Sequence, residues 1–297
     1  MNLPSVGKFK DILEDLINIM DSEESKGGYL TGFRRGGVIV LEYFNGPIAV
    51  IGDIHGDYNT LDKILGNLEE LEVIGRGLVV FLGDYIDRGP PEGQIATLAR
   101  LYDLKKQLGE KIILLRGNHE PPQGLDPYPH DYREALLEIY GSIGYDLYVH
   151  SRRFFDKLPH ALIIRNHILA LHGGPPTITE AIDPLEYLAW DRGGSLEEIL
   201  WNDPSEFIEY KAPNPRGAGS LWGPRVTEYS LNLTKTRLIV RGHEAAALGY
   251  KFNHKGKVLT LFSRLGAPYY NYAAAYLACE ELEALVSNIL RCLKTIS

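Results

Sequence analysis

The apolar positions along the first 120 residues predict an alternation of helices and strands. Residues 8–21 carry Phe, Ile, Leu and Met at helical spacing, so an amphipathic N-terminal helix is expected there. Short apolar runs typical of strands lie within 36–53, 77–84 and 110–120. The segments 57–70, with Asp57 as a suitable N-cap, and 92–108 carry helical periodicity between them. This order predicts a parallel sheet with right-handed crossovers, and therefore an α/β fold class.

Hairpins and loops are predicted where turn residues separate the apolar runs. Asn45-Gly46 divides 36–53 into two strands and is a strong hairpin dipeptide. Residues 160–174 and 249–263 also read as hairpins, and 236–244 as one more strand. Residues 121–130 hold four prolines and are expected to form a loop before a helical stretch at 132–158.

Two segments are not assigned by their pattern. Residues 272–293 fit both a strand followed by a helix and two strands, and residues 175–235 show no clear order. Nothing in the chain resembles a repeat or a linker that would divide it. We therefore expect one domain over residues 1–297, beginning with the helix at 8–21.

Composition narrows the classes of function. A net charge of −8 argues against binding of nucleic acid and of an anionic membrane surface. The N-terminus lacks the apolar run of a signal peptide, and no stretch of about 18 apolar residues occurs, so the expected location is the cytoplasm. Cys279 and Cys292 form neither a zinc motif nor the disulfide framework of a secreted protein, and both are expected to be core residues.

Polar side chains follow five of the predicted strands at the point where each strand ends. They are Asp53 and His55, Asp84, Asn118 and His119, His172, and His243. Carboxylate oxygen together with imidazole nitrogen suits divalent metals such as Mn, Fe or Zn. Asp84 can bridge two ions, with Asp53 and His55 on one ion and Asn118, His172 and His243 on the other. The pattern therefore favours a bimetallic site.

Each of these short patterns also has a purely structural interpretation. "GDIHGD" alone fits a turn after a strand, and a single His172 or Asn118-His119 fits a satisfied core position. The coincidence of all five argues against that interpretation, because burying so many charged groups without an ion costs several kcal/mol for each. His130, His160, His167 and His254 show no such convergence and are expected to be structural or solvated.

The motifs in their order resemble those of the PPP-type serine/threonine phosphoprotein phosphatases, within the calcineurin-like metallophosphoesterase superfamily. The motifs are "GDIHGD" at 52–57, "GDYIDRG" at 83–89, "RGNHE" at 116–120 and "HGG" at 172–174. Weaker similarities continue to about residue 280, among them "LWNDP" at 200–204, "PRGAGSLWG" at 215–223 and "TLFSRLGAPYY" at 260–270. The resemblance implies a metallophosphoesterase fold, a central β-sandwich flanked by helices, with a two-metal site at the carboxyl ends of strands.

The resemblance also implies a role for each matched residue. The metal ligands would be Asp53, His55, Asp84, Asn118, His172 and His243. His119 would be the general acid, oriented by Asp87, and Arg88, Arg216 and Asn118 would bind the substrate phosphate. Tyr270 would line the substrate pocket, with Tyr269 or neither as the alternatives. Asp203 would lie behind the metal ligands and support them without binding an ion itself.

The implied reaction is direct attack of a dimetal-bound hydroxide on a phosphomonoester. Two divalent ions are expected as cofactors, Mn²⁺ in vitro, with Fe or Zn as alternatives. The substrates would be proteins phosphorylated on serine or threonine, and phosphotyrosine is not distinguished from them. The sequence identifies no regulatory subunit.

The chain departs from the familiar eukaryotic pattern in places that bear on substrate choice. The proline-rich 121–130 follows "RGNHE" in place of the usual continuation, Asp57 replaces Gln, and Arg264-Leu265-Gly266 interrupts a Ser-Ala-Pro-Asn-Tyr run. These differences are typical of a prokaryotic, archaeal-like member. A dinucleoside-polyphosphate hydrolase, acting on diadenosine tetraphosphate, is the alternative enzyme. A non-catalytic phosphopeptide-binding protein is the alternative from another class.

Overall fold

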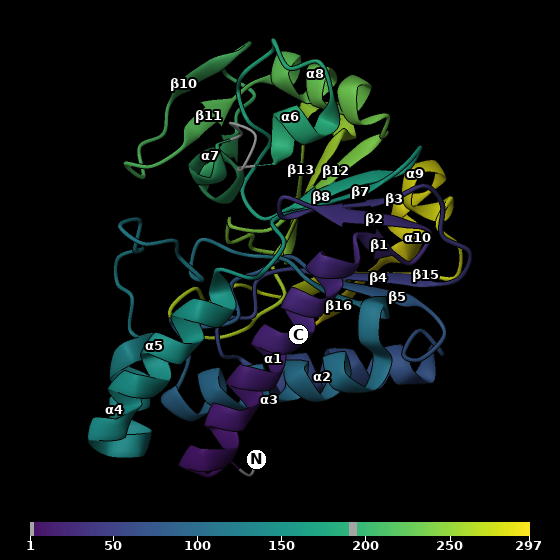
Figure 1. Cartoon of the computed structure of the whole chain (residues 1–297). Coiled ribbons are helices and arrows are strands. Elements are labelled where there is room, and N and C mark those ends of the chain that lie inside the picture. Colours follow the sequence, from purple (N-terminus) through teal and green to yellow (C-terminus); the bar gives the residue numbers. More distant parts are fainter. Residues whose placement is uncertain (1–2, 190–194) are drawn as a thin grey trace.

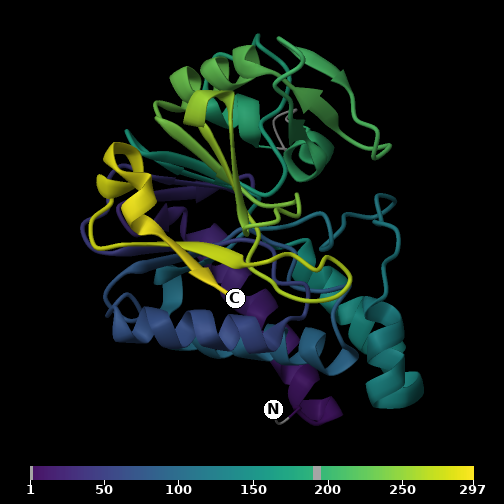
Figure 2. The same cartoon turned by 180° about the vertical axis from the view of Figure 1, so that it is seen from behind.

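Two large sheets lie face to face in the middle of the molecule, and helices cover the outer face of each (Figure 1, Figure 2). The computed structural model describes residues 3–189 and 195–297. Apolar side chains from both sheets form one cluster in the layer between them. The β-sandwich flanked by helices is therefore confirmed, as is the mixture of helix and strand.

The five-stranded sheet contains the parallel unit predicted from the sequence. Its order is β16-β15-β4-β5-β6, with β4 (Ile48–Ile51), β5 (Leu78–Phe81), β6 (Ile112–Leu114), β15 (Ala274–Cys279) and β16 (Leu293–Ile296). Strands β4, β5 and β6 pair in parallel, so Ile51 lies opposite Phe81 and Phe81 opposite Leu114. The carboxyl ends of these three strands therefore meet at one edge of the sheet.

Five helices share one apolar cluster with the outer face of this sheet. They are α1 (Val6–Lys26), α2 (Tyr58–Glu70), α3 (Pro91–Leu108), α4 (Tyr132–Tyr140) and α5 (Gly144–Phe155). The predicted helices at 8–21 and 57–70 are confirmed. The Ser5 side chain caps α1 by accepting from the Lys8 backbone N–H, and Asp57 caps α2 by accepting from that of Thr60.

The eight-stranded sheet brings two more strand ends to the same region. Its order is β1-β2-β3-β7-β8-β12-β14-β13. The strands are β1 (Gly28–Tyr29), β2 (Gly32–Arg35), β3 (Val38–Leu41), β7 (Ala161–Ile164), β8 (Ile168–Leu171), β12 (Leu238–Arg241), β13 (Tyr250–Asn253) and β14 (Val258–Leu261). The hairpins β7–β8 and β13–β14 are confirmed as antiparallel pairs. Because β8 and β12 are parallel, His172 and His243 follow neighbouring strand ends.

The segment that the sequence left unassigned covers the outer face of this second sheet. It contains α6 (Pro184–Leu188), α7 (Leu196–Trp201), α8 (Pro224–Thr234) and a small sheet of β9 (Asp203–Pro204), β10 (Lys211–Pro213) and β11 (Ser220–Trp222). Short 3-10 helices occur at Gly109–Lys111, Gly141–Ile143 and His254–Gly256. Within residues 3–189 and 195–297, none of the helices combines the length and apolar character needed to cross a bilayer. The assignment of residues 1–297 to one domain stays a prediction.

The hairpin predicted around Asn45-Gly46 is wrong. Both strands form, but β3 pairs with β2 and β7, whereas β4 pairs with β5 and β15. Ile39 of β3 and Val50 of β4 lie in the same apolar cluster between the sheets. The connection therefore crosses from one sheet to the other, because burying both strands in the sandwich outweighs the local turn preference.

The two cysteines are buried, as expected, but they are bonded to each other. Cys279 ends β15 and Cys292 ends α10 (Ile289–Cys292), and their Cα atoms are 4.8 Å apart. The chain leaves β15, passes through α9 (Ala284–Ser287) and α10, and returns as β16, which pairs antiparallel with β15. The C-terminal segment therefore combines the two alternatives, a helix and a second strand.

Candidate active site

The polar residues that follow five predicted strands converge on one buried site. Asp53 and His55 follow β4, Asp84 follows β5, Asn118 and His119 follow β6, His172 follows β8, and His243 follows β12. All seven side chains are buried, none more than 7% exposed. Since these strands belong to both sheets, the site lies where the two halves of the sandwich open at their carboxyl edges.

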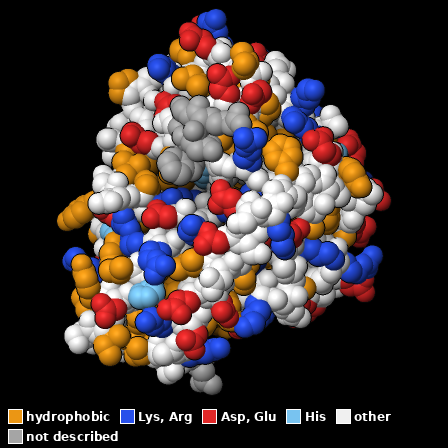
Figure 3. Space-filling view, viewed as in Figure 1, with side chains coloured by type: hydrophobic (Ala, Val, Ile, Leu, Met, Phe, Trp, Pro, Cys, Tyr) orange, Lys and Arg blue, Asp and Glu red, His pale blue; other side chains and the backbone are white. Residues whose placement is uncertain are grey.

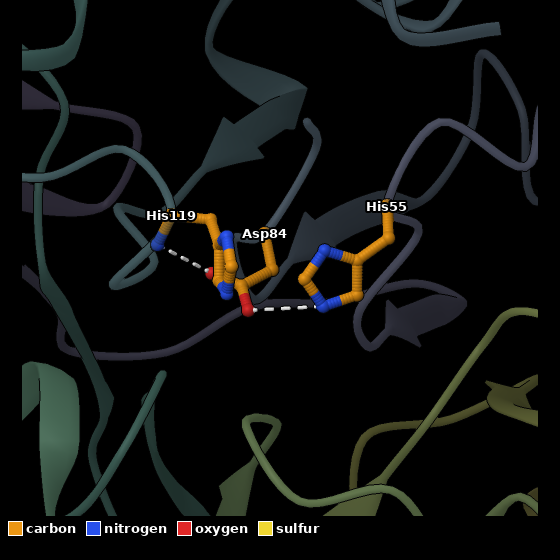
Figure 4. A group of neighbouring side chains, drawn as sticks. All are labelled: His55, Asp84 and His119. Atoms are coloured by element: carbon orange, nitrogen blue, oxygen red, sulfur yellow. Dashed lines mark hydrogen bonds and ion pairs between the residues drawn. The ribbon is translucent and has the colours of Figure 1, made fainter. Parts of the chain in front are cut away.

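Asp84 lies at the centre of this group. Its Oδ2 is 3.3 Å from His55 Nε2, and its Oδ1 is 3.3 Å from His172 Nε2. In Figure 4 the Asp84 carboxylate lies beside the rings of His55 and His119, and the backbone N–H of His119 donates to Oδ1 at 2.9 Å. Two sets of three potential ligands share it: His55, Asp84 and His119, and Asp84, His172 and His243.

The hydrogen bonds around the histidines leave lone pairs facing oxygen atoms. His55 Nδ1 donates to the Ile86 carbonyl at 2.8 Å, so in the neutral ring Nε2 carries the lone pair that faces Asp84. His172 Nδ1 likewise donates to the Leu82 carbonyl at 3.0 Å, and its Nε2 lies 2.9 Å from Asn118 Oδ1. Acceptors that converge without protons between them are the arrangement that a cation stabilises.

Asp53 and His243 complete the group from opposite sheets. Asp53 Oδ1 accepts from the His243 backbone N–H at 2.9 Å, while Oδ2 is buried without a hydrogen-bond partner among the described residues. That oxygen is 3.8 Å from His55 Nε2. His243 Nδ1 lies 2.9 Å from Asn118 Oδ1. The residues present therefore fit a pair of divalent cations bound by nitrogen and oxygen ligands.

The buried ligands have pKa values that are shifted in opposite directions. Burial lowers the pKa of His55 to about 3, so its ring is neutral at physiological pH. Burial would raise the pKa of Asp84, but His172, His119 and His55 together hold it well below its usual range. Burial and repulsion from Asp84 raise the pKa of Asp53 to about 6. A cation between these two carboxylates would relieve that repulsion.

His119 and Asp87 form a close pair beside the ligands. His119 Nδ1 lies 2.5 Å from Asp87 Oδ2, which leaves Nε2 as the nitrogen available to a substrate. Burial disfavours the imidazolium, but the carboxylates of Asp84 and Asp87 outweigh it and raise the pKa of His119. The structure thus brings together His119, which the family resemblance implies is the general acid, and Asp87, which it implies orients that histidine.

A cavity of about 540 Å³ gives access to these residues, and Arg88, Arg216, Asn118 and His119 all line it. The Arg88 guanidinium donates to the Tyr128 carbonyl at 3.2 Å, and Arg216 Nε donates to Asp203 Oδ2 at 2.7 Å. On the face shown in Figure 3, charged side chains of both signs border a hollow near the middle. The cavity therefore combines two guanidinium groups with the ligand cluster, a combination suited to a phosphate.

The structure does not bring Tyr270 to this cavity. Its side chain is 76% exposed, whereas the neighbouring Tyr269 lines the cavity and stacks on His55 with ring centroids 5.7 Å apart. The Tyr269 hydroxyl lies 3.4 Å from His55 Nε2. Of the two tyrosines that the sequence offered, the cavity wall therefore contains Tyr269 and not Tyr270.

Several residues around the site were not found from the sequence. His130 contacts Asp87 with its Nδ1 2.7 Å from Oδ2, and Trp201 lines the cavity. Glu120 accepts three backbone N–H groups that hold the segments of Asp84 and Asn118. Arg241 is fully buried at the end of β12 and donates to Asp203 at 3.0 Å. Asp203, which also accepts from Arg216, is thereby linked to the eight-stranded sheet. Hydrophobic periodicity identifies none of these residues, although Glu120 and Trp201 lie inside the quoted motifs "RGNHE" and "LWNDP".

Comparison with known proteins agrees with this geometry. Residues 46–247 match the family model described as calcineurin-like phosphoesterase, and the chain belongs to that family. It is therefore a hydrolase of phosphate esters.

Among its relatives are two protein phosphatases. The serine/threonine-protein phosphatase 6 catalytic subunit of Drosophila melanogaster is 32% identical over 82% of this chain and 78% of its own. The serine/threonine-protein phosphatase ppe1 of Schizosaccharomyces pombe is 34% identical over 78% of this chain and 73% of its own. A solved protein serine/threonine phosphatase from Saccharomyces cerevisiae, with similarity to human phosphatase PP5, has the same fold, with a TM-score of 0.76 and 23% identity over 99% of this chain and 90% of its own.

Proposed function

We propose that this chain is a protein serine/threonine phosphatase that hydrolyses phosphomonoesters with two divalent cations. The observation that carries the proposal is the shared cavity, in which Arg88 and Arg216 lie with Asn118 and His119 beside the ligand cluster centred on Asp84. Relatives named as serine/threonine-protein phosphatases at 32% and 34% identity support the class of substrate.

The ligands of the two cations would be Asp53, His55, Asp84, Asn118, His172 and His243, with Asp84 shared. When bound, the ions would neutralise phosphoryl oxygens and lower the pKa of a water molecule. Mn²⁺ is the ion to supply first in vitro, and Fe and Zn also suit these nitrogen and oxygen donors.

The chain's own residues would orient the ester and move one proton. Arg88 and Arg216 present planar guanidinium groups that bind phosphate oxygens bidentately, and Asn118 adds an amide donor. His119, held through Nδ1 by Asp87, would give the proton on Nε2 to the departing oxygen of serine or threonine. Such an acid contributes about 10² to 10⁴ in rate.

A substrate panel tests the proposal. Peptides carrying phosphoserine, phosphothreonine or phosphotyrosine are compared with diadenosine tetraphosphate, with and without Mn²⁺, on the wild type and Asp84→Asn. We expect Mn²⁺-dependent release of phosphate from the phosphoserine and phosphothreonine peptides, and its loss in Asp84→Asn. Faster cleavage of the dinucleotide than of every peptide would instead support the alternative hydrolase. Phosphopeptide binding without any turnover would support a non-catalytic protein.

A further inference from the structure

The proline-rich loop, residues 121–131, contacts the catalytic side of the site at three points. The Tyr128 carbonyl accepts from the Arg88 guanidinium at 3.2 Å, and the Asp131 carboxylate accepts from the Arg88 backbone N–H at 3.2 Å. His130 Nδ1 lies 2.7 Å from Asp87 Oδ2. This loop is one of the places where the sequence departs from the family pattern.

Asp87 receives hydrogen bonds from two histidines on the same oxygen. His119 Nδ1 is 2.5 Å from Oδ2 and His130 Nδ1 is 2.7 Å from it, while Oδ1 accepts from the Tyr132 backbone N–H at 2.8 Å. The side chain of Asp87 is 0% exposed, so water does not replace a lost donor easily. A carboxylate held by three donors in a buried position has little freedom to rotate away from His119.

His130 is itself oriented from its far side. Its Nε2 lies 2.9 Å from the Tyr148 hydroxyl on α5, and that hydroxyl accepts from Arg152 Nη1 at 3.3 Å. Arg152 also forms an ion pair with Asp126 of the proline-rich loop. With the Tyr148 hydroxyl donating to Nε2, the neutral ring of His130 carries its proton on Nδ1, where it can only donate to Asp87.

We propose that His130 is a positioning residue of the reaction, which fixes the Asp87 carboxylate so that it holds His119 in the orientation needed to protonate the leaving group. This inference rests on the proposed function. His130 does not touch the substrate and acts through Asp87. A merely structural role, in which His130 only fastens the loop, predicts a different pattern of kinetics.

The leaving group separates the two roles. A general acid matters most when the departing oxygen is strongly basic, as in a phosphothreonine peptide or phenyl phosphate, and least for 2,4-dinitrophenyl phosphate, whose leaving group needs no proton. His130→Ala should therefore lower kcat about tenfold on the first two substrates and by less than about twofold on the third, with KM and bound Mn²⁺ unchanged. His130→Asn, whose Nδ2 can replace Nδ1 as the donor, should recover most of the rate.

Two further variants guard against a folding defect. Tyr148→Phe leaves the contact with Asp87 in place but removes the donor that orients His130, so a smaller loss with the same dependence on leaving group is expected. His150→Ala removes a part-buried histidine that lies on α5 and does not contact Asp87; its Nδ1 lies 2.7 Å from the Asp146 carbonyl, and this variant should match the wild type. An equal loss on all three esters, or no loss on any, would overturn the proposal.

A measurement without substrate keeps this proposal separate from the proposed function. In the ¹⁵N-histidine-labelled, Zn²⁺-loaded protein, the Nδ1 proton of His119 should give a downfield resonance from its bond to Asp87. We expect His130→Ala to move or broaden that resonance and His150→Ala to leave it in place. If no phosphomonoester is hydrolysed but the resonance still responds, the proposed function fails, whereas the contact by which His130 orients Asp87 and His119 stands. An unchanged His119 resonance in His130→Ala would contradict the positioning role of His130.

Discussion

Glu120 holds the backbone around Asp84 in place through three hydrogen bonds. Replacing Glu120 by Gln should therefore weaken the support of Asp84. Glu120 Oε2 accepts from the backbone N–H groups of Asp84 at 2.8 Å and Gly117 at 3.0 Å, and Oε1 accepts from Tyr85 N–H at 2.8 Å. Asp84 has a left-handed backbone, φ 56°, which few L-residues adopt without such support.

A glutamine can satisfy only part of this pattern. Its best orientation keeps the oxygen at the Oε2 position and turns the amide NH₂ toward Tyr85 N–H, so that two donors face each other. Leaving a buried N–H unpaired costs about 1–3 kcal/mol, although removal of a buried charge offsets part of the loss. For a chain of this size we expect the unfolding temperature to fall roughly 2–4 °C for each kcal/mol.

The assay combines thermal unfolding with phosphopeptide hydrolysis at pH 8. Burial and the Asp84 carboxylate raise the pKa of Glu120 to about 7, so the side chain is largely ionised at that pH. Because Asp84 is held less firmly, kcat/KM should also fall about tenfold. Glu180→Gln, at an exposed position, is the matched control. If Glu120→Gln has the same unfolding temperature and the same kcat/KM as Glu180→Gln, the Glu120 carboxylate does not support Asp84.

Three further predictions concern the cavity wall and the stability of the fold. Tyr269→Ala should raise the KM for a phosphothreonine peptide by up to about tenfold, since a lost aromatic contact is worth about 0.5–1.5 kcal/mol. Tyr270→Ala, at a side chain that is 76% exposed, should not change it, and steady-state kinetics in which Tyr270→Ala has the larger effect would contradict the placement. Replacing Cys279 and Cys292 by Ser removes a disulfide that closes a loop of 13 positions. The free energy of unfolding in urea should fall by about 3 kcal/mol, and the rate of phosphate release should not change. A double variant as stable as the oxidised wild type would refute this prediction. Lys105→Met removes the nearer of two cations that pair with the buried Glu23 carboxylate, 2.5 Å away, and leaves Arg34 at 3.5 Å. It should cost about 3 kcal/mol in urea unfolding, the low end for a broken buried pair, whereas a cost no greater than that of Met at the exposed Lys63 would show that the pair contributes little.

The elements that the sequence predicted well are those whose signal is local. Strands β4, β5 and β6 carry continuous apolar runs, and the polar residues at their ends follow directly from the parallel order. The N-cap of α2 is likewise a local feature, because the Asp57 side chain accepts from the backbone N–H of Thr60, three residues further on. The residues at these strand ends are therefore predicted from the sequence to lie together.

The errors concern features that depend on how distant parts of the chain meet. The Asn45-Gly46 turn connects different sheets because both flanking strands are buried between them. The bond from Cys279 to Cys292 depends on the return of β16 onto β15. His130 reaches Asp87 only because a loop without periodicity folds back over the site, and the sequence offers no more than its unusual composition as a signal.

We propose that this chain binds a pair of divalent cations on which its hydrolysis of phosphate esters depends. The most direct measurement is a titration of the chelator-stripped protein with Mn²⁺, with bound metal and phosphothreonine-peptide hydrolysis followed on the same samples. We expect two ions per chain, a rate that rises with occupancy, and fewer bound ions in Asp84→Asn. Full activity in the stripped protein, or titration without any bound ion, would contradict the account.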